Sequence, residues 1–569
     1  MGVASLTWRC LHLLHEGHHY VLSADSYFFH WQAQRLLSDQ DIPVRLHSGL
    51  TYPLVYATRA WSFVFGTPQS EALRWCSLLL PPVIGLMGAV FLLIMVSKMY
   101  SSRVAILSAV VWVVALYPVF ITTAGYLDRD GLSAILIAVG VLIFHLSRDW
   151  HVRIGQADVG WLAGVATVLA IEALLYIEWL AYGPVLLLTI LAASWAAEVI
   201  MPAGRILYQM TMRPQADLID IIIEWLRLLG RNVWRSRWRP LLLVLAINAV
   251  ILLVFAAKVG EYIDLLLSLA RASLGGASAV AELVGLAPAD LLAYQCFLIA
   301  AVVGVYVTFR SGRSADCSLL GWFGCLFAVA IFAKRAFLLA APGMCILSGV
   351  GLAHMLDFGN LPLSRADLAR ALSYYDFRIL GRYAAAGLGL IILLVGLLVS
   401  FPSAASIGDS GFVAADSDWQ DGMGWLRDNT PQEAAVLAQW TFGYYILDLA
   451  DRRPVVDNGL YGWDEERNYD ISVVHCTTDV LVAIAIMRKY EASYVVFSDL
   501  EYPMLRKMTD DVFGEAYGDG SGIPSQLRGS VYARALSGSL LSEGGLRRVY
   551  PEEAAVGGVP LVILALDSA

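Results

Sequence analysis

The chain has 569 residues, of which 58% are hydrophobic and 15% are charged, and its mean hydropathy is +0.64. Soluble globular domains carry about 25% charged residues, so this composition excludes an ordinary soluble protein and indicates an integral membrane protein. The formal net charge of −9 argues against a nucleic-acid partner, because such a partner needs a clustered basic surface.

The apolar segments predict a polytopic α-helical membrane domain over residues 1–401. A helix that spans a bilayer needs about 20 mostly apolar residues. Ten segments meet or approach this length: 76–98, 104–122, 131–147, 158–178, 181–200, 240–257, 291–308, 318–333, 337–356 and 383–401. The boundary between the fourth and fifth stays open, because Glu172 and Glu178 fall within one long apolar stretch. The arginine- and tryptophan-rich segment 211–238 is typical of an amphipathic helix on a membrane surface.

The distribution of lysine and arginine predicts how these helices are oriented. Most of these residues between 76 and 401 fall in one set of alternating loops, which the positive-inside rule assigns to the cytoplasm. The outer side then receives segment 21–75, the loops 123–130 and 258–290, and everything after residue 401. The chain is therefore predicted to be a multi-pass protein of the plasma or inner membrane, in contact with its lipids.

Residues 402–569 have the composition of a soluble domain. They include 25 acidic and 12 basic residues, a net charge of −13, whereas the rest of the chain carries +4. Helix-like runs at 416–428 and 479–489 alternate with β-rich runs at 434–440, 453–456, 494–497 and 559–566. This alternation predicts an α/β fold for an extracytoplasmic C-terminal domain.

Acidic residues gather in the predicted outer loops. They are Asp25, Asp128, Asp130 and Glu282. Carboxylates at a membrane boundary are costly unless they are paired or metal-bound, and oxygen-rich loops on one face suit a hard divalent cation such as Mg²⁺ or Mn²⁺. The alternative is that these acids are ordinary polar residues of solvated loops.

Two further patterns leave alternatives open. The dipeptide Lys334–Arg335 lies on the outer side against the charge trend, which predicts an anionic partner, either an acid of this chain or a lipid phosphate.

His15-Glu16-Gly17-His18-His19 satisfies the H-E-x-x-H signature of zinc proteases. A glycine interrupts that motif and no long apolar helix surrounds it, so a solvated segment is the competing interpretation.

Five motifs together resemble those of a known family, the catalytic subunits of oligosaccharyltransferase, which are membrane glycosyltransferases of the GT-C fold. Segments 25–30 (DSYFFH) and 125–130 (GYLDRD) resemble the first-loop aspartate and second-loop D-x-D motifs. Segment 279–282 (AVAE) is similar to the fifth-loop motif, and Arg335 with its neighbours to the arginine that contacts the donor phosphate. Segments 439–445 (QWTFGYY) and 453–459 (RPVVDNG) resemble the WWDYG block and the stretch beyond it.

The resemblance implies transfer of a glycan from a polyprenyl phosphate or diphosphate carrier to the asparagine amide of Asn-x-Ser/Thr, with inversion of the anomeric carbon. It implies that Mn²⁺ or Mg²⁺ is held by Asp25, by one or both of Asp128 and Asp130, and by Glu282. It also implies that Asp25 and Glu282 act on the acceptor amide and that Arg335 binds the donor phosphate. It assigns acceptor binding to one set of residues: Trp440, Thr441, Phe442, Gly443, Met504 and Lys507. The compact chain resembles the single-subunit bacterial and archaeal enzymes, which implies action without further subunits.

The sequence also departs from the family pattern. Gln439 replaces the first tryptophan of the block, and Thr441 replaces the aspartate that accepts the hydrogen bond of the acceptor hydroxyl. The family has about twelve membrane helices, against ten here. A GT-C glycosyltransferase with a different acceptor, such as another protein, a polymer or a lipid, is therefore the second hypothesis. A transporter or scaffold is a third, but transporters place charged residues at mid-membrane depth rather than in outer loops.

Overall fold

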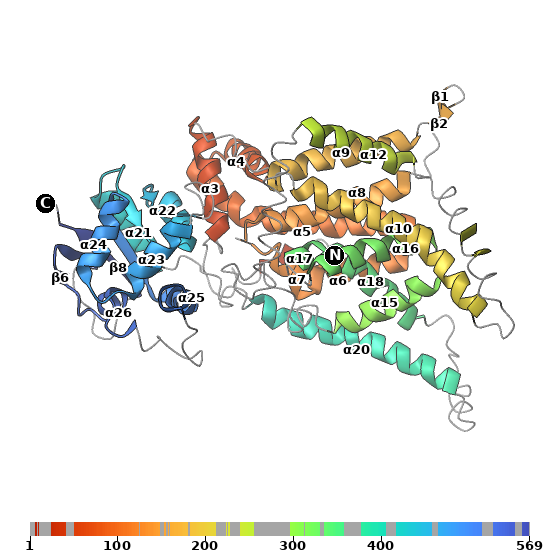
Figure 1. Ribbon diagram of the computed structural model, residues 1–569. Helices are drawn as coiled ribbons and strands as arrows, with labels where there is room; N and C mark the ends of the chain where they lie inside the picture. The colour runs from red at the N-terminus through yellow and green to blue at the C-terminus, as the bar shows by residue number, and fades with distance from the viewer. Residues whose placement is uncertain are drawn as a thin grey trace. The chain divides into compact units, whose positions relative to one another are not determined.

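The computed structural model (Figure 1) describes most of the chain. The described residues are 6–7, 9–10, 24–40, 50–124, 126–147, 153–154, 157–158, 160–179, 182–211, 223–224, 226–227, 239–254, 296–311, 313–330, 335–357, 377–405, 417–457, 465–514, 527–551 and 560–567. Glu282, Lys334, the H-E-x-x-H residues and nearly all of segment 211–238 lie outside them.

The chain forms two compact units, which we call the helical unit and the α/β unit. The helical unit comprises Met1–Gly17, Leu80–Ala124 and Arg129–Ile407, and the α/β unit comprises His18–Leu79, Gly125–Asp128 and Gly408–Ala569. The boundary near residue 407 lies close to the predicted one at 401. Segment 18–79, which the sequence analysis assigned to the membrane domain, groups instead with the C-terminal residues.

The helical unit is built from apolar helices that correspond to the ten predicted segments. Their bounds are α5 Gln69–Met99, which begins in the α/β unit, α6 Ser102–Val114, α7 Leu116–Phe120, α8 Arg129–Ser147, α9 Gly160–Trp179, α10 Tyr182–Thr211, α12 Arg239–Val254, α15 Phe297–Ser311, α16 Ser314–Ala330, α17 Arg335–Leu339, α18 Ala341–Met355 and α20 Phe377–Ala405. A two-stranded ribbon, β1 Arg153–Ile154 and β2 Ala157–Asp158, precedes α9. Almost every side chain of α18 is buried, and this helix packs against both α6 and α15.

Two of the predicted helices are each split in two. Segment 104–122 breaks at Ala115, which has extended backbone, and continues as α7 with Pro118 in its first turn. Segment 337–356 breaks at Ala340, and α18 restarts there with Pro342 in its first turn. Proline fits best in the first turn of a helix, where no intrahelical N–H bond is lost, so a helix tends to restart just before it. The prediction of one continuous helix was therefore wrong in both places.

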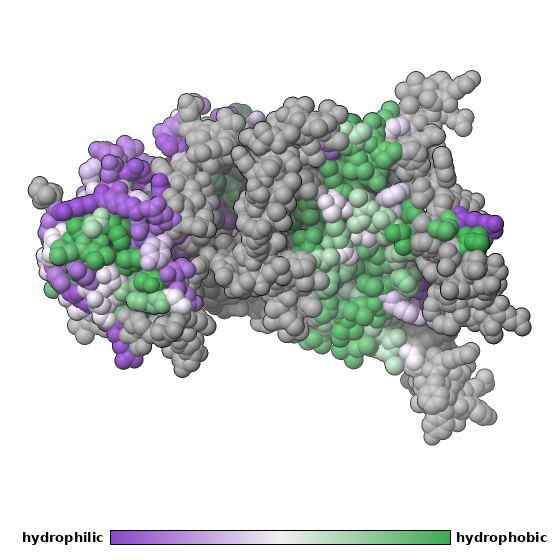
Figure 2. Space-filling model, viewed as in Figure 1, coloured by the Kyte–Doolittle hydropathy of each residue, from purple (hydrophilic) through white to green (hydrophobic). Residues whose placement is uncertain are grey.

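The surface of the helical unit fits a membrane. Among the described residues, α5 and α8 are long and apolar enough to cross a bilayer, and seven shorter apolar segments of 10–17 residues accompany them. Figure 2 shows apolar side chains gathered on the visible face of this unit. Ile94, Val302 and Leu398 are among its exposed large apolar residues. A soluble protein rarely exposes contiguous apolar area of this extent, so we treat the helical unit as membrane-embedded.

The α/β unit begins with two helices that the sequence analysis did not predict, α3 Ala24–Leu37 and α4 Thr51–Phe65. The later elements include all the predicted helices and strands and several more. Their bounds are α21 Ser417–Asn429, β3 Ala435–Leu437, η5 Trp440–Phe442, α22 Gly443–Asp448, β4 Arg453–Pro454, α23 Glu465–Cys476, α24 Val480–Lys489, β5 Ala492–Ser498, η6 Asp499–Glu501, α25 Tyr502–Phe513, α26 Val531–Leu536, β6 Ser542–Glu543, β7 Leu546–Tyr550 and β8 Leu561–Leu566.

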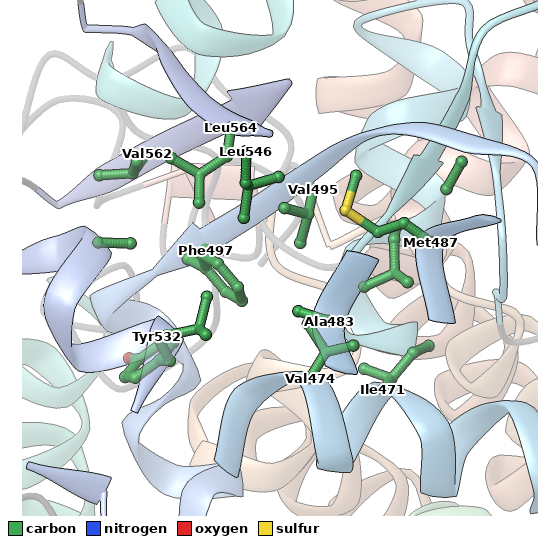
Figure 3. Close-up of a cluster of buried hydrophobic side chains, with 14 of the residues drawn as sticks. Ile471, Val474, Ala483, Met487, Val495, Phe497, Tyr532, Leu546, Val562 and Leu564 are labelled. Atoms are coloured by element: carbon green, nitrogen blue, oxygen red, sulfur yellow. The ribbon is translucent and has the colours of Figure 1, made fainter. Parts of the chain in front are cut away.

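The strands form a six-stranded mixed sheet with the order β4-β3-β5-β8-β7-β6. Strands β4, β3 and β5 are parallel, and the remaining pairs are antiparallel. Alternate residues of a strand point to opposite faces, and two core clusters result. In the first cluster, Val495, Phe497 and Leu564 pack against α23–α26. Figure 3 shows these strand residues beside side chains of α23, α24 and α26. In the second cluster, Val496 and Ile563 pack against α3, α21 and α22. The predicted α/β fold is confirmed as a helix–sheet–helix sandwich.

Candidate functional site

The C-terminal edge of the three parallel strands gathers the motifs of the α/β unit. Strand β3 leads into the 439–443 block, β4 leads into Val455–Asp457, and β5 leads into η6 and α25 with Met504. In open α/β sheets, ligands bind in the crevice beyond the carboxyl ends of the strands. The sheet topology therefore places the predicted acceptor-binding residues where this fold class binds ligands.

The 439–443 block follows β3 at the edge of the sheet, with Trp440 on the first core cluster and Phe442 in the second. The side-chain Oε1 of Gln439 accepts the backbone N–H of Thr441 at 2.8 Å and so caps the 3₁₀ turn η5. Trp440 is half-buried and packs on the first core cluster, as does Met504 of α25. Phe442 is only 2% exposed and stacks on Trp419 with ring centroids 4.5 Å apart. Trp440 and Met504 thus border the same edge, whereas Phe442 supports the block from the core.

Thr441 carries a buried polar atom that the described residues leave unpaired. Its Oγ1 is buried, and within the described residues it has no hydrogen-bond partner. A buried hydroxyl that makes no hydrogen bond costs about 1–3 kcal/mol. This hydroxyl can both donate and accept, so it suits a polar group of a bound molecule.

Gly443 joins the block to the stretch that follows β4. A Cβ atom at this position would lie 2.6 Å from the carbonyl oxygen of Val456 and 2.5 Å from Cβ of Asp457. Only glycine allows this approach without a shift of the backbone. Asp457 itself is fully buried, so two motifs that are separate in sequence share one packed surface.

Helix α3 brings the first-loop motif to the same region. Tyr27 makes an edge-to-face contact with Tyr445, and Phe28 stacks on Tyr444, both with ring centroids 4.6 Å apart. Nδ1 of His30 lies 2.8 Å from Oδ1 of Asp448 on α22. Burial lowers the pKa of His30, but the neighbouring Asp448 outweighs it, and the pKa is raised. An ion pair and two aromatic contacts therefore fix α3 on α22.

Asp25 lies in the first turn of α3 and is half-buried. A carboxylate at this position is favoured by the helix dipole. Because α3 is fixed on α22, the structure brings the helix that carries Asp25 together with the 439–443 block and with Asp457. This convergence links residues more than 400 positions apart.

The second-loop acids are buried, with Asp128 6% exposed and Asp130 1% exposed. Asp128 belongs to the α/β unit, whereas Asp130 lies in the first turn of α8 in the helical unit. Arg335 begins α17, and its side chain lies outside the description, as do Glu282 and the side chain of Lys507.

The chemistry of the predicted metal ligands fits a hard cation, because every donor is a carboxylate oxygen. Within the described residues, no group of three or more His, Cys, Asp or Glu side chains is arranged to hold a metal ion. The predicted set includes Glu282, which is not described, so its assembly stays a prediction.

The structure also shows functional candidates that the sequence analysis missed. Asp448 forms an ion pair with His30. Glu501, which directly precedes the helix that carries Met504, forms an ion pair with His475. Single acids between apolar residues gave no signal for either role, because each partner is distant in sequence. Arg9 was missed for the same reason, because its partners Trp112 and Thr122 are also distant in sequence.

Known proteins resemble this chain in sequence over part of its length and in fold over most of it. No family model matches the chain. It is 25% identical over 234 residues to subunit stt3 of the dolichyl-diphosphooligosaccharide–protein glycosyltransferase of Schizosaccharomyces pombe, a match covering 34% of this chain and 30% of the relative. It is 24% identical over 270 residues to dolichyl-phosphooligosaccharide-protein glycotransferase 2 of Pyrococcus furiosus, covering 43% and 31%. The chain thus spans about a third of the length of these relatives.

A solved structure shows the same fold over nearly the whole chain. The oligosaccharyltransferase AglB of Archaeoglobus fulgidus, in complex with an inhibitory peptide and a dolichol-phosphate, has a TM-score of 0.70 at 15% identity, covering 96% of this chain and 78% of that one. The chain is therefore similar in sequence to parts of these two glycosyltransferases, and it shares its fold with the oligosaccharyltransferase AglB.

Proposed function

We propose that the chain is a glycosyltransferase that moves a glycan from a polyprenyl phosphate or diphosphate carrier to the side-chain amide of asparagine in Asn-x-Ser/Thr, with inversion. The convergence of α3 with the 439–443 block and Asp457 in one compact unit carries the proposal. The names of the relatives support it, since both are glycosyltransferases that act on protein from dolichyl-linked oligosaccharides.

The proposed chemistry assigns a role to each predicted residue. An amide nitrogen is a poor nucleophile, because its lone pair is delocalised into the carbonyl. Asp25 and Glu282 accept hydrogen bonds from the acceptor amide and orient its nitrogen for attack. Arg335 neutralises charge on the leaving phosphate. Asp25, Asp128, Asp130 and Glu282 hold Mg²⁺ or Mn²⁺, which supplies Lewis-acid stabilisation of the phosphate oxygens when bound.

Solved relatives are consistent with these ligands. One Archaeoglobus structure, with a TM-score of 0.65 at 13% identity, is tethered to an acceptor peptide with the NVT sequon. Another, with a TM-score of 0.61 at 14% identity, is a complex with zinc and sulfate. For this chain we propose a lipid-linked donor, a peptide acceptor and an active site on the outer side of the cell membrane, in a protein that acts as a single subunit.

The experiment combines purified chain in detergent, Mn²⁺, a pool of lipid-linked oligosaccharide and a fluorescent Asn-x-Thr peptide. We expect a glycopeptide that disappears with EDTA and falls by at least about 100-fold in Asp25→Ala, the loss expected for a group acting on the reacting atoms. Arg547→Ala, on the exposed face of β7, serves as the control and keeps activity. A wild-type chain that leaves donor and peptide unchanged contradicts the proposal.

Thr441 favours a second candidate, in which the donor is the same but the acceptor differs. The family aspartate is absent, and Oε1 of Gln439 already accepts the N–H of Thr441. The Oγ1 of Thr441, which has no hydrogen-bond partner among the described residues, is then the group of this turn that we propose binds the acceptor. Consumption of the donor with its glycan recovered on another protein group, polymer or lipid, and with no Asn-x-Ser/Thr peptide modified, would establish this alternative.

A further inference from the structure

Arg9 is a fully buried cationic residue in the helical unit. Its Nε donates to Oγ1 of Thr122 at 2.6 Å, and its Nη2 donates to the carbonyl oxygen of Trp112 at 3.0 Å. Its own backbone carbonyl accepts the N–H of Ala124 at 2.9 Å. A guanidinium is costly to bury in a membrane protein, and such residues are commonly functional. The contacts of Arg9 show which segment it serves.

These contacts span the break between α6 and α7. The carbonyl of Trp112 belongs to the last turn of α6, where carbonyl groups lack intrahelical partners and a cation is favoured by the helix dipole. The hydroxyl of Thr122 donates to the carbonyl oxygen of Pro118 in α7 at 2.6 Å, so it accepts from Arg9. Through this chain of hydrogen bonds Arg9 holds the ends of both helices.

Gly85 on α5 makes room for the guanidinium. A Cβ atom at this position would clash with Nε of Arg9 and lie 2.8 Å from Oγ1 of Thr122. The carbonyl of Gly85 accepts the indole N–H of Trp112 at 2.8 Å, which holds α5 and α6 around the same point. The pocket for Arg9 is therefore formed by two helices, α5 and α6, and by the 121–124 segment that follows α7.

The segment that Arg9 holds supports the start of α8. A Cβ atom at Gly131 would lie 2.5 Å from the carbonyl oxygen of Ile121 and 3.0 Å from Cγ2 of Thr122. The first turn of α8, which contains the buried Asp130, thus rests directly on the 121–124 segment. A shift of the 121–122 backbone would be passed to the first turn of α8 through the close contact between Gly131 and the carbonyl group of Ile121, which is backbone rather than a flexible side chain.

We propose that Arg9 is a positioning residue, which fixes the 121–124 segment and thereby the place of Asp130 at the start of α8. This inference rests on the proposed function, in which Asp130 is a ligand of the divalent cation. Arginine suits the role because its rigid fork reaches acceptors on α6 and on the 121–124 segment at once, whereas the single ammonium of lysine does not reproduce that geometry.

The test measures Mn²⁺ binding by the electron paramagnetic resonance signal of the free ion, with the full chain in detergent. We expect Arg9→Lys and Thr122→Val to weaken binding about tenfold, because a lost buried hydrogen bond is worth about one factor of ten. Gly85→Ala should reproduce the effect by displacing the guanidinium. In glycopeptide assays the same variants should need about ten times more Mn²⁺ for half-maximal activity, with an unchanged KM for the peptide. Arg310→Lys, on the exposed face of α15, is the matched control.

Hydrogen exchange at residues 121–134 gives a readout that is independent of activity. Faster exchange there in the Arg9, Thr122 and Gly85 variants supports the inference. Unchanged exchange and unchanged Mn²⁺ binding in all three variants, beside a wild-type chain that binds Mn²⁺ and glycosylates the peptide, overturns the inference and leaves the proposed function intact. A wild-type chain that binds no Mn²⁺ and transfers no glycan contradicts the proposed function, and the inference falls with it.

Discussion

At the scale of single residues, two buried arginines of the α/β unit contrast in their hydrogen bonding. Arg452 is 6% exposed, and its guanidinium donates to Oγ1 of Thr430 and to four backbone carbonyl oxygens. Arg548 on β7 is also 6% exposed, yet within the described residues none of its three side-chain nitrogens has a hydrogen-bond partner. Burial lowers the pKa of Arg548.

We therefore expect opposite effects when each arginine is replaced by methionine. Arg452→Met should destabilise the α/β unit by about 3 kcal/mol, because it leaves several buried carbonyl groups unpaired. Arg548→Met should be neutral or stabilise by about 1 kcal/mol, because it removes a buried charge for which the described residues provide no hydrogen-bond partner. Urea unfolding followed by tryptophan fluorescence measures both, with the exposed Arg547→Met as control. A loss of more than about 1 kcal/mol in Arg548→Met would show that this guanidinium has a partner.

Gly443 gives a second prediction at this scale. Gly443→Ala should weaken peptide binding and destabilise the unit by about 1–3 kcal/mol, because the new methyl group forces the block away from Val456 and Asp457. Gly424→Ala in α21 is the matched control: its nearest neighbour would be the end of Arg427 at 3.8 Å, so it should stabilise by about 0.5–1 kcal/mol. Fluorescence anisotropy of a labelled peptide and thermal unfolding check the pair. Equal changes in stability for Gly443→Ala and Gly424→Ala would argue against the close approach of Gly443 to Val456 and Asp457.

At the scale of elements, a buried ion pair joins α23 to the turn that precedes α25. Nδ1 of His475 lies 2.7 Å from the carbonyl oxygen of Ile471, which can only accept, so Nδ1 carries a hydrogen. Nε2 lies 3.2 Å from Oε2 of Glu501, and both side chains are fully buried. Burial lowers the pKa of His475, but Glu501 and the Ile471 carbonyl outweigh it, and the pKa is raised.

A raised histidine pKa sets the sign of the pH dependence. The pair stabilises fully below the unfolded-state pKa of about 6.5, and its contribution is lost as the pH rises through the higher folded-state value. We expect the opening free energy of α23 amides, measured by hydrogen exchange, to fall as the pH is raised above about 6.5. Glu501→Gln should remove this pH dependence. His354→Asn, which changes an exposed histidine of α18, is the control and should leave the pH dependence unchanged. A stability that is flat with pH in the wild-type chain would contradict the ion pair.

In the helical unit, a buried hydrogen bond between Asn248 and Glu172 joins α12 to α9. Nδ2 of Asn248 donates to Oε2 of Glu172 at 2.9 Å, and both residues are buried. Asn248→Leu should destabilise the chain in detergent by about 1–3 kcal/mol, because it leaves a buried carboxylate without its donor. The double variant Glu172→Leu/Asn248→Leu should recover most of that loss, since both polar groups are then gone. Thermal unfolding in detergent measures the series, and additive losses would show that the two side chains are not coupled.

The elements differ in how far the sequence predicted them. Strands β5 and β8 were predicted because their apolar runs are short and bounded by polar turns, and both faces of each strand are indeed covered. Strand β7 was missed because Arg547 and Arg548 interrupt its apolar pattern, although Arg548 is buried. The breaks at Ala115 and Ala340 had a signal in Pro118 and Pro342. That signal is not decisive, since Pro81 and Pro82 lie inside the unbroken α5.

At the scale of the whole molecule, the sequence predicted the two kinds of domain and the motifs but not the grouping of segments. Composition separates apolar from soluble regions because it is a local property. That α3 packs on α22, and therefore groups with the C-terminal residues, depends on aromatic contacts such as Phe28 with Tyr444 that join distant segments. No local pattern encodes such a pairing. The contacts of Arg9 were unpredictable for the same reason.

The central claim is that this chain joins a glycan to the side-chain nitrogen of asparagine. The most direct measurement uses an Asn-x-Thr peptide with ¹⁵N in the asparagine side chain, incubated with the purified chain, Mn²⁺ and a lipid-linked oligosaccharide pool, and sequenced by tandem mass spectrometry. We predict a product in which the sugar mass is retained on the ¹⁵N-labelled asparagine, and no product from the matching Gln-x-Thr peptide. Sugar attached to another residue, or donor consumed while the asparagine stays unmodified, would contradict the claim.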